Sequence, residues 1–309
     1  MPLPAGVPDR LRRHPALQGV IVTDLIRSGT RQQVMKIRHA GRAAFLKCYL
    51  GPFAAQRHQA ACLRLRQAGT ILNGQNRVVR ALLELEDCHA LIMSAAPGRP
   101  MQDLLLTSDP ERRLALVRRA GNWLACLVSA REARPFFAWK LHQRLADYIR
   151  NFPADDTVDM PLVRSHMDLM ERLTRRVHGA KVAHGLSHGD FHPENLFIAE
   201  KGARLTMTGI DMETADPIPL VEDLARMLVW LECITPPQPG RKSGINRQAF
   251  EALCASQAPL READRLVLHF HLGQMLLEFY LRRGARLPAV RRRMTRALIH
   301  WARSDLNAG

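Results

Sequence analysis

The sequence lacks any long hydrophobic run: no part of its 309 residues approaches the ~20 apolar residues that a membrane-spanning helix needs. Residues 1–6 contain no hydrophobic segment of a signal peptide, so we expect a cytoplasmic protein. The six cysteines form no C-x-x-C pair, which argues against a zinc site and a disulfide framework. We expect them to be reduced residues of a sizeable globular core.

Acidic residues are also scarce. Asp and Glu number 29 against 45 Lys and Arg, so the formal net charge is +16. A basic surface attracts anions, so a polycationic partner is disfavoured relative to a neutral, zwitterionic or phosphorylated one, and contact with an anionic surface stays open. Nucleic acid is an unlikely partner because no zinc motif or clear recognition helix accompanies the charge.

Two short motifs carry the chemistry, residues 186–198 and 209–213. Phosphoryl transfer needs a carboxylate near the acceptor proton and oxygen ligands for Mg²⁺. Asp190 can serve as the base, Asn195 can offer an amide oxygen, and Asp211 can offer a carboxylate. Mg²⁺ takes oxygen ligands and usually only one or two protein carboxylates, so one Asn and one Asp suit it.

The surrounding residues place these motifs on strands. Residues 196–199 and 204–210 are apolar or alternating runs separated by Lys201-Gly202, which predicts a hairpin. The pattern H-G-D-x-x-x-x-N followed by a strand ending I-D resembles the aminoglycoside phosphotransferase and choline kinase group of small-molecule kinases. Gly189 stands where protein kinases carry Arg.

This resemblance implies an α+β, two-lobed protein-kinase-like fold with a small antiparallel-sheet N-lobe and a mostly helical C-lobe. It also implies ATP and Mg²⁺ as cofactors. Individual residues have simpler interpretations: His188 is more often a packed structural histidine, and His192 and Glu194 are loop-shaping residues. Asp190 or Asp211 alone could be a turn or cap residue.

Two further carboxylates lie near these motifs. Glu213 could assist the metal or point to solvent. Asp223 matches the acidic residue of the family's D-L-A segment, and at a helix start it can accept N–H bonds from that end or bond back to the catalytic loop.

The N-terminal third contains the strand lysine that such a kinase requires. Residues 43–49 form an apolar strand carrying Lys47, after strands at 20–26 and 33–38. The resemblance implies that Lys47 binds the α- and β-phosphates; the alternative is a solvated edge lysine. Residues 27–32 could curl over the phosphates, but with one glycine a turn without a ligand is an equal alternative.

The next helix departs from the family pattern. Residues 53–68 have helical periodicity and end at Gly69, a stop signal. In the family this helix usually offers a Glu to the strand lysine, yet no acid occurs between Cys48 and Leu83. Gln56 and Gln59 are the nearest candidates, and a neutral amide can bond the lysine without neutralising it.

A hairpin at 82–86 and 90–93 leads into residues 94–101, which are rich in Pro and Gly. The resemblance makes this segment the hinge, where the adenine would bond backbone groups from Ser94 to Ala96; an ordinary linker is a compatible alternative. The predicted organisation is an N-lobe at 1–93, a hinge at 94–100 and a C-lobe at 101–309.

Beyond the hinge the apolar periodicity is helical. Steps of three and four residues predict helices at 110–131, 138–151, 161–178, 221–233, 246–256, 261–283 and 288–305. Residues 235–244 read as a polar loop. Acceptor-binding candidates on these helices are Glu222, Trp230, Glu232, Glu278, Phe279 and Tyr280. An aromatic and acidic mixture can hold a cationic amine, although aromatic residues at helical spacing are more often core.

The leading hypothesis is an ATP-dependent, Mg²⁺-requiring kinase acting on a hydroxyl of a sugar, amino-alcohol or aminoglycoside-like acceptor. The alternative is a kinase-fold nucleotide-binding regulator or scaffold with little transfer activity, which the missing helix acid and the weak Gly loop support. The acceptor, the choice of ATP or GTP and the oligomeric state stay open.

Overall fold

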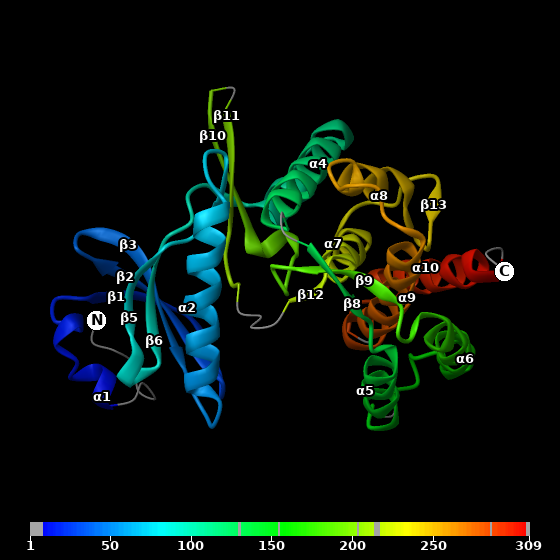
Figure 1. Cartoon of the computed structure of the whole chain (residues 1–309), viewed down its shortest axis with the longest axis horizontal. Helices are drawn as coiled ribbons and strands as arrows, with labels where there is room; N and C mark the ends of the chain where they lie inside the picture. The colour runs from blue at the N-terminus through cyan, green and yellow to red at the C-terminus, as the bar shows by residue number, and fades with distance from the viewer. Residues whose placement is uncertain are drawn as a thin grey trace. The chain divides into compact units, whose positions relative to one another are not determined.

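The computed structural model describes residues 9–128, 131–153, 155–202, 204–212, 217–284 and 286–306. The chain divides into two compact units (Figure 1). The first comprises Met1–Arg99 and Phe197–Asp216, and the second Pro100–Leu196 and Pro217–Gly309. The contacts between residues group 197–216 with the N-terminal unit. The boundaries predicted from the sequence place these residues in the C-lobe, and those lobe boundaries stay a prediction.

The first unit is built on an antiparallel sheet in the order β1-β2-β3-β6-β5. Its strands are β1 Ile21–Ser28, β2 Gln32–His39, β3 Arg42–Tyr49, β5 Ala81–Leu85 and β6 Ala90–Ser94. All five were predicted from apolar or alternating runs. Ala40 and Gly41 join β2 to β3, and both have positive φ, as a tight two-residue hairpin turn requires.

Alternation along β3 separates its two faces. Leu46 and Cys48 belong to a buried cluster that also includes Leu11 and Leu17, so α1 (Asp9–Arg12) and η1 (Pro15–Leu17) cover that face. Successive side chains of a strand point to opposite faces, so Lys47 faces the other way. Figure 1 shows α1 and α2 on opposite sides of this sheet. The sequence did not predict α1.

Helix α2 spans Ala54–Ile71 and contains no acidic residue in its first turn. The predicted stop at Gly69 is wrong by three residues, because the last helical residue is Ile71 and the cap is Leu72. Gly69 has no positive φ, and the helix ends instead at Leu72, whose N–H bonds the Ala68 carbonyl.

A second sheet in the order β4-β11-β10-β7 contains the predicted hairpin. Its strands are β4 Asn76–Val78, β7 Arg99–Pro100, β10 Leu196–Lys201 and β11 Arg204–Gly209. Strand β11 pairs in parallel with β4, with Gly209 opposite Val78. Because β11 ends there, the segment that carries Asp211 follows directly from this sheet.

The second unit is mostly helical, as predicted. Its helices are α3 Met101–Thr107, α4 Pro110–Leu127, α5 Ala138–Arg150, α6 Met160–Val177, α7 Leu220–Ile234, α8 Arg247–Cys254, α9 Glu262–Phe279 and α10 Pro288–Leu306. Asp109 and Asp159 cap α4 and α6 by accepting a backbone N–H. A π-helical turn at Tyr280–Gly284 follows α9. The sequence did not predict α3.

A small sheet in the order β12-β9-β8 completes this unit, with β8 Arg131–Pro135, β9 Lys181–Gly185 and β12 Ile218–Pro219. The helix predicted at 110–131 therefore ends too late, because α4 ends at Leu127 and Arg131 begins β8. Strand β8 is exposed along its whole length, so no apolar alternation marks it, and pairing with β9 holds it extended. Strands β13 Arg241–Lys242 and β14 Ile245–Asn246 form a pair. The first lies in the predicted loop, and Asn246, the predicted first residue of a helix, instead ends β14 and caps α8.

Two expectations about composition can be compared with the structure. All six cysteines are free thiols, but Cys126 is exposed and Cys254 half-buried, so the prediction that all are core residues is wrong for these two. Within the described residues, no helix is both long and apolar enough to cross a membrane.

Candidate active site

The first unit contains a cavity of about 710 Å³ at the face of the sheet that carries Lys47. Its walls are largely apolar, with Phe45, Met93 and Phe197 among them, and its charged lining includes Lys47 and Asp211. A ligand with a flat apolar part and an anionic part would match such a lining.

Lys47 and Asp211 form an ion pair inside this cavity. The Lys47 Nζ lies 2.5 Å from Asp211 Oδ1. Lys47 is 1% exposed, and a buried ammonium is costly unless it is paired. The ring of Tyr49 lies 5.6 Å from the same Nζ. Asp211 therefore supplies the carboxylate that pairs with Lys47, since helix α2 has no acidic residue in its first turn. A hydrogen bond from Gln56 or Gln59 to Lys47 stays a prediction.

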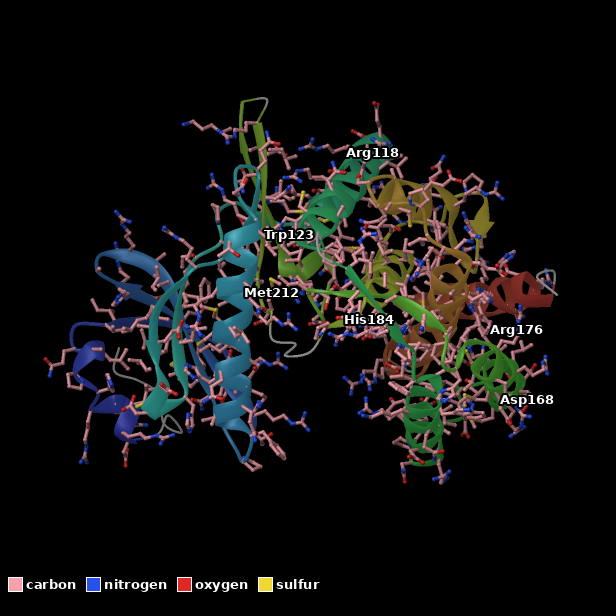
Figure 2. All side chains as sticks on the ribbon, viewed as in Figure 1. Arg118, Trp123, Asp168, Arg176, His184 and Met212 are labelled. Atoms are coloured by element: carbon pink, nitrogen blue, oxygen red, sulfur yellow. The ribbon has the colours of Figure 1, made fainter. Side chains whose placement is uncertain are left out.

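Asp211 has a left-handed backbone, with φ of +63°. Asp tolerates this conformation better than most residues do. The adjacent Met212, labelled in Figure 2, is 1% exposed and anchors the segment, whereas the Asp211 side chain is 37% exposed. One oxygen of Asp211 is thus held by Lys47 while the carboxylate stays accessible. Glu213, a second predicted candidate, lies outside the described residues.

The predicted adenine-binding segment also lines the cavity, through Ser94, Ala95 and Ala96. The Ser94 N–H donates to the Arg80 carbonyl at 2.9 Å, and Ser94 Oγ accepts the Arg80 N–H at 3.0 Å. These bonds engage the Ser94 N–H. No backbone hydrogen bond among the described residues uses the Ala96 N–H. Of the two predicted residues, Ala96 is therefore the one whose N–H is available to a ligand.

The connection between β1 and β2 closes on itself. The Gly29 N–H donates to the Gln32 carbonyl at 3.0 Å, and both Arg27 and Gln32 line the cavity. The turn is therefore closed by its own hydrogen bond, as expected for the predicted alternative of a turn without a ligand. Contact with phosphates stays a prediction.

The second unit contains the catalytic-loop motif, in which several side chains converge on Asp190. His192 Nε2 lies 3.2 Å from Asp190 Oδ2, and the Asn195 amide nitrogen donates to the Asp190 carbonyl at 2.9 Å and to Oδ2 at 3.2 Å. Arg226 Nη1 lies 3.8 Å from Asp190 Oδ1. Because Asn195 uses its nitrogen on Asp190, its Oδ1 is the atom left for a metal ion.

These contacts keep Asp190 ionised. Burial raises the pKa of Asp190, but the hydrogen bond and charge of His192 and the charge of Arg226 outweigh it and lower the pKa to about 2. The side chain remains 52% exposed. Asp190 is therefore an accessible carboxylate held in one orientation.

His192 does more than shape the loop. Its ring stacks on Trp230 of α7, with centroids 4.0 Å apart and planes 5° from parallel. The Nε2 also lies 3.1 Å from the Asn195 amide nitrogen, but a carboxylate can only accept, so Nε2–H donates to Asp190 and the Asn195 contact is packing. The sequence analysis missed this role, and it missed Arg226.

Asp223 holds the catalytic-loop motif through two hydrogen bonds to its backbone. Its carboxylate accepts the His188 N–H at 2.7 Å and the Gly189 N–H at 3.0 Å, and it is 0% exposed. The predicted alternative of bonding back to the catalytic loop is thus confirmed. Burial raises the pKa of Asp223 to about 7, although the two backbone N–H groups favour its charged form. Gly189 has φ of +80°, a conformation that favours glycine.

His188 is a packing residue, as predicted. It is 0% exposed, and its ring lies 5.8 Å from those of Trp123 and Phe191. Glu194 accepts a bond from Gln102 at 2.8 Å, which is consistent with a loop-shaping role.

The predicted acceptor-binding residues separate into two groups. Glu232 bonds Arg241 at 2.7 Å and the Asn246 N–H at 3.1 Å, and Tyr280 accepts the Asp159 N–H at 2.8 Å. Glu232 and Tyr280 are buried, and these bonds show that both stabilise the fold.

In the other group, Trp230 stacks on His192 and Phe279 packs against Trp230. Trp230 has the guanidinium of Arg283 at 4.1 Å on its ring, and Phe279 packs edge-on at 5.6 Å. Glu222 is paired with Arg226 at 3.3 Å. Two arginines thus accompany the aromatic residues nearest the catalytic loop. Glu278 accepts a bond from the Gln274 side chain at 3.1 Å.

Comparisons with known proteins agree with this description. A profile described as the phosphotransferase enzyme family matches residues 23–253. A sequence search of curated proteins found no match.

Among solved structures, a thermostable mutant of aminoglycoside phosphotransferase APH(4)-Ia is similar, with 17% identity, a TM-score of 0.59 and coverage of 92% of this chain and 95% of that one. A choline/ethanolamine kinase family protein from Mesorhizobium loti has 16% identity, a TM-score of 0.58 and coverage of 96% of each chain. An ethanolamine kinase from Plasmodium vivax has 12% identity, a TM-score of 0.53 and coverage of 94% and 84%. At such identities the likeness shows a shared fold.

Proposed function

Because the chain belongs to the phosphotransferase enzyme family, we propose that it transfers the γ-phosphate of ATP to a hydroxyl group of a small-molecule acceptor. The observation that carries the proposal is the environment of Asp190, a charged, half-exposed carboxylate held by His192 and Asn195. The lysine-containing cavity of the first unit supports a nucleotide as the second substrate.

Asp190 would accept a hydrogen bond from the acceptor hydroxyl and orient its oxygen toward the phosphorus. A carboxylate with a pKa of about 2 is a weak base, so it takes the proton only late, as the new O–P bond forms. Phosphoryl transfer passes through a loose transition state and depends chiefly on positioning and charge, so a weak base is sufficient.

Magnesium fits the available donors. Mg²⁺ binds oxygen ligands, and Asp211 presents an accessible carboxylate while Asn195 has only its amide oxygen left. These two residues would hold the ion, which when bound neutralises phosphate charge. Lys47 would bind the α- and β-phosphates from its position in the cavity wall.

Nucleotide use is consistent with the structural relatives. One structure of an APH(4)-Ia mutant is described as a ternary complex with ADP and hygromycin B, and another as one with AMP-PNP and hygromycin B. For this chain the nucleotide cavity supports ATP, with Ala96 as the backbone donor to the base.

The acceptor we favour is neutral, zwitterionic or anionic, such as a sugar or a phosphorylated sugar. Arg226 lies beside Asp190, and Arg283 lies over Trp230. Glu222, the acid nearest to them, is already paired with Arg226. A polycationic aminoglycoside would meet like charges at these positions.

The test is Asp190→Asn, assayed for ATP-dependent phosphate mass gain across sugars, amino-alcohols and aminoglycosides with Mg²⁺. The amide keeps the shape but loses the negative charge that orients the hydroxyl, so we expect transfer to fall ~10²-fold or more. Nucleotide affinity should stay within a few-fold because Asp190 contributes nothing to the cavity of the first unit.

Asp168→Asn is the matched control, since Asp168 lies on α6, is exposed and undergoes the same chemical change (Figure 2). Full transfer by Asp190→Asn would contradict the assignment. Mg²⁺-dependent ATP binding by the unaltered protein without any product would instead favour a nucleotide-binding regulator.

A further inference from the structure

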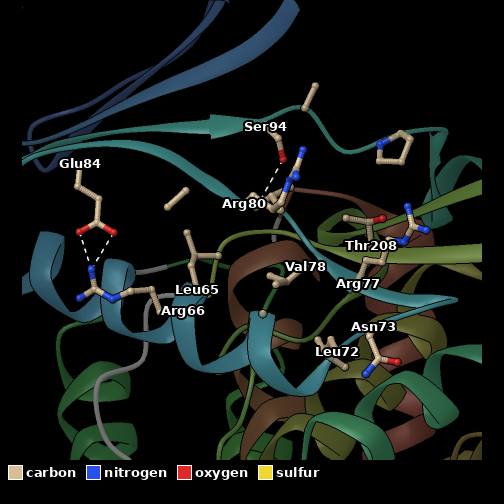
Figure 3. A pocket seen from close by; sticks show the side chains of 15 residues that line it. Leu65, Arg66, Leu72, Asn73, Arg77, Val78, Arg80, Glu84, Ser94 and Thr208 are labelled. Carbon is tan, nitrogen blue, oxygen red and sulfur yellow. Dashed lines mark hydrogen bonds and ion pairs between the residues drawn. The ribbon is translucent and has the colours of Figure 1, made fainter. Parts of the chain in front are cut away.

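A second cavity in the first unit, of about 870 Å³, is larger than the nucleotide cavity. It lies between α2, β4, β5, the end of β6 and β11 (Figure 3). Val79, Ser94 and Ala95 line both cavities, so they form a shared wall. None of the residues assigned to phosphoryl transfer except Ser94 lines the second cavity.

Charge of one sign predominates in this lining, which contains three arginines and a single carboxylate. Arg66 is neutralised by Glu84, whose two oxygens lie 2.8 and 2.7 Å from one guanidinium nitrogen. The Arg80 side chain makes no hydrogen bond or ion pair with any other described residue. Figure 3 shows Arg77 and Arg80 on the strand side of the cavity, away from the Arg66–Glu84 pair.

An orphaned hydroxyl points to a ligand independently of the charge. Thr208 lines the cavity and is 3% exposed, yet its Oγ1 has no hydrogen-bond partner in the described part of the chain. Buried hydroxyls are almost always bonded, so an unsatisfied one needs a reason. An oxygen acceptor of a bound molecule would satisfy it.

We propose that this cavity binds a small organic anion bearing a carboxylate or phosphate group. Arg80 would bind the oxyanion, because a guanidinium group matches the geometry of such groups. The Arg77 Nε donates to the Gly74 carbonyl at 2.9 Å, so Arg77 adds positive charge to the lining. Thr208 would donate to a second oxygen, and Leu65 and Leu72 would contact the carbon skeleton. This site does not depend on the proposed transfer reaction.

Gly69 gives a direct way to fill the cavity. It lies in α2 on the cavity wall, and a Cβ added there would meet no other atom within 4 Å. Gly69→Leu should therefore occupy the cavity without displacing a native contact, and a leucine favours the helix more than glycine does. The variant should be as stable as the natural protein or more stable.

Calorimetric titration of the full chain with citrate and 3-phosphoglycerate at fixed ionic strength tests the proposal. We expect saturable one-to-one binding of at least one probe. Arg80→Ala should weaken it roughly tenfold, equivalent to loss of one charge-assisted bond of ~1.4 kcal/mol. Gly69→Leu should abolish it while thermal unfolding shows the protein folded.

Two controls separate this site from other anion binding. Arg42→Ala removes an exposed arginine elsewhere in the same sheet and should leave the affinity unchanged. Lys47→Ala should also leave it unchanged, whereas binding in the nucleotide cavity would be lost. No saturable binding of any probe, full binding by Gly69→Leu, or loss of binding in Lys47→Ala would each overturn the proposal.

Discussion

His192 joins the catalytic loop to α7, because one edge of its ring bonds Asp190 while its face stacks on Trp230. The stacking fixes the ring, and the ring in turn fixes the carboxylate. Arg226, from the same helix α7, adds a second positive charge near Asp190. The orientation of the Asp190 carboxylate thus depends on side chains that lie more than 30 positions away in the chain.

The substitution His192→Phe tests this arrangement, since phenylalanine keeps the stacking on Trp230 and removes the hydrogen bond. His192 lowers the pKa of Asp190, so its removal raises that pKa. In the proposed mechanism the charged carboxylate orients the acceptor hydroxyl, so the acidic limb of the kcat/KM profile should move to higher pH. The measurement is kcat/KM against pH with the best acceptor.

His178→Phe makes the same change at an exposed histidine and should leave the profile in place. An unshifted acidic limb in His192→Phe would show that the hydrogen bond does not set the ionisation of Asp190.

Spacing in the sequence was sufficient to predict the loop and the strand end that carry the candidate site residues. Asp190 and Asn195 fall in one loop and contact each other, and Asp211 follows β11 as expected. Their predicted roles in transfer stay predictions. His192 could not be assigned from the sequence, because its function depends on Trp230, and a contact between two elements leaves no local pattern.

At the scale of elements, Gly98 permits a close approach within the first unit. Its φ is +92°, and a Cβ there would lie 1.9 Å from the Ile198 carbonyl oxygen of β10. Only a residue without a side chain lets these two backbone segments meet. Gly98 also lines the cavity that contains Lys47, so this approach shapes the wall of that cavity.

Gly98→Ala should lower the free energy of unfolding by more than ~2 kcal/mol, since it combines an unfavourable φ with a clash against backbone. Urea unfolding followed by fluorescence measures this change. Gly41→Ala is the control, because Gly41 also has a positive φ, +73°, but open space around it. Equal losses in the two variants would rule out the clash as the cause.

Long helices were predicted well because their periodicity extends over several turns, as in α5 and α6. The errors fall at the ends of elements, in the short helices α1 and α3, and in short strands. Strand β8 has no alternating burial, and it exists because β9 supplies its hydrogen-bonding partner. Such a strand is specified by its neighbour and not by its own residues.

At the scale of the whole molecule, buried histidines govern the response to acid. Burial lowers the pKa of His166 and of His271 to about 4. The groups that face His271 are Glu222, Arg226 and His184. The unfolded chain takes up a proton at each histidine below about pH 6.5, whereas the folded protein does so only near pH 4. Each histidine therefore makes the protein less stable as the pH falls through this window.

Replacing His271 by Phe removes one of these groups. The difference in unfolding free energy between the variant and the unaltered protein should shift by ~2 kcal/mol in favour of the variant when the pH falls from 7.5 to 5. This follows because pH 5 lies about 1.5 units below the ordinary histidine pKa, and each unit corresponds to ~1.36 kcal/mol. Asp223 acts in the opposite direction, since its raised pKa favours the folded state at low pH, but it is common to both proteins and cancels. Urea titrations at both pH values measure the difference.

His178→Phe should show no such dependence on pH. A difference between His271→Phe and the unaltered protein that stays constant from pH 7.5 to 5 would mean that His271 is already charged in the folded protein.

The sequence by itself determined the kind of chemistry and the kind of fold. The spacing of Asp190, Asn195 and Asp211 depends only on chain order, and the helical periodicity is repeated often enough to be recognised. The tertiary structure alone decided that Lys47 pairs with Asp211 and that Asp223 holds the catalytic loop. It also decided that an arginine-lined cavity, in which Thr208 Oγ1 has no hydrogen-bond partner among the described residues, shares a wall with the cavity that contains Lys47. These features arise from contacts between residues far apart in the chain, and the energy of such contacts is set by distance and burial, which no local pattern encodes.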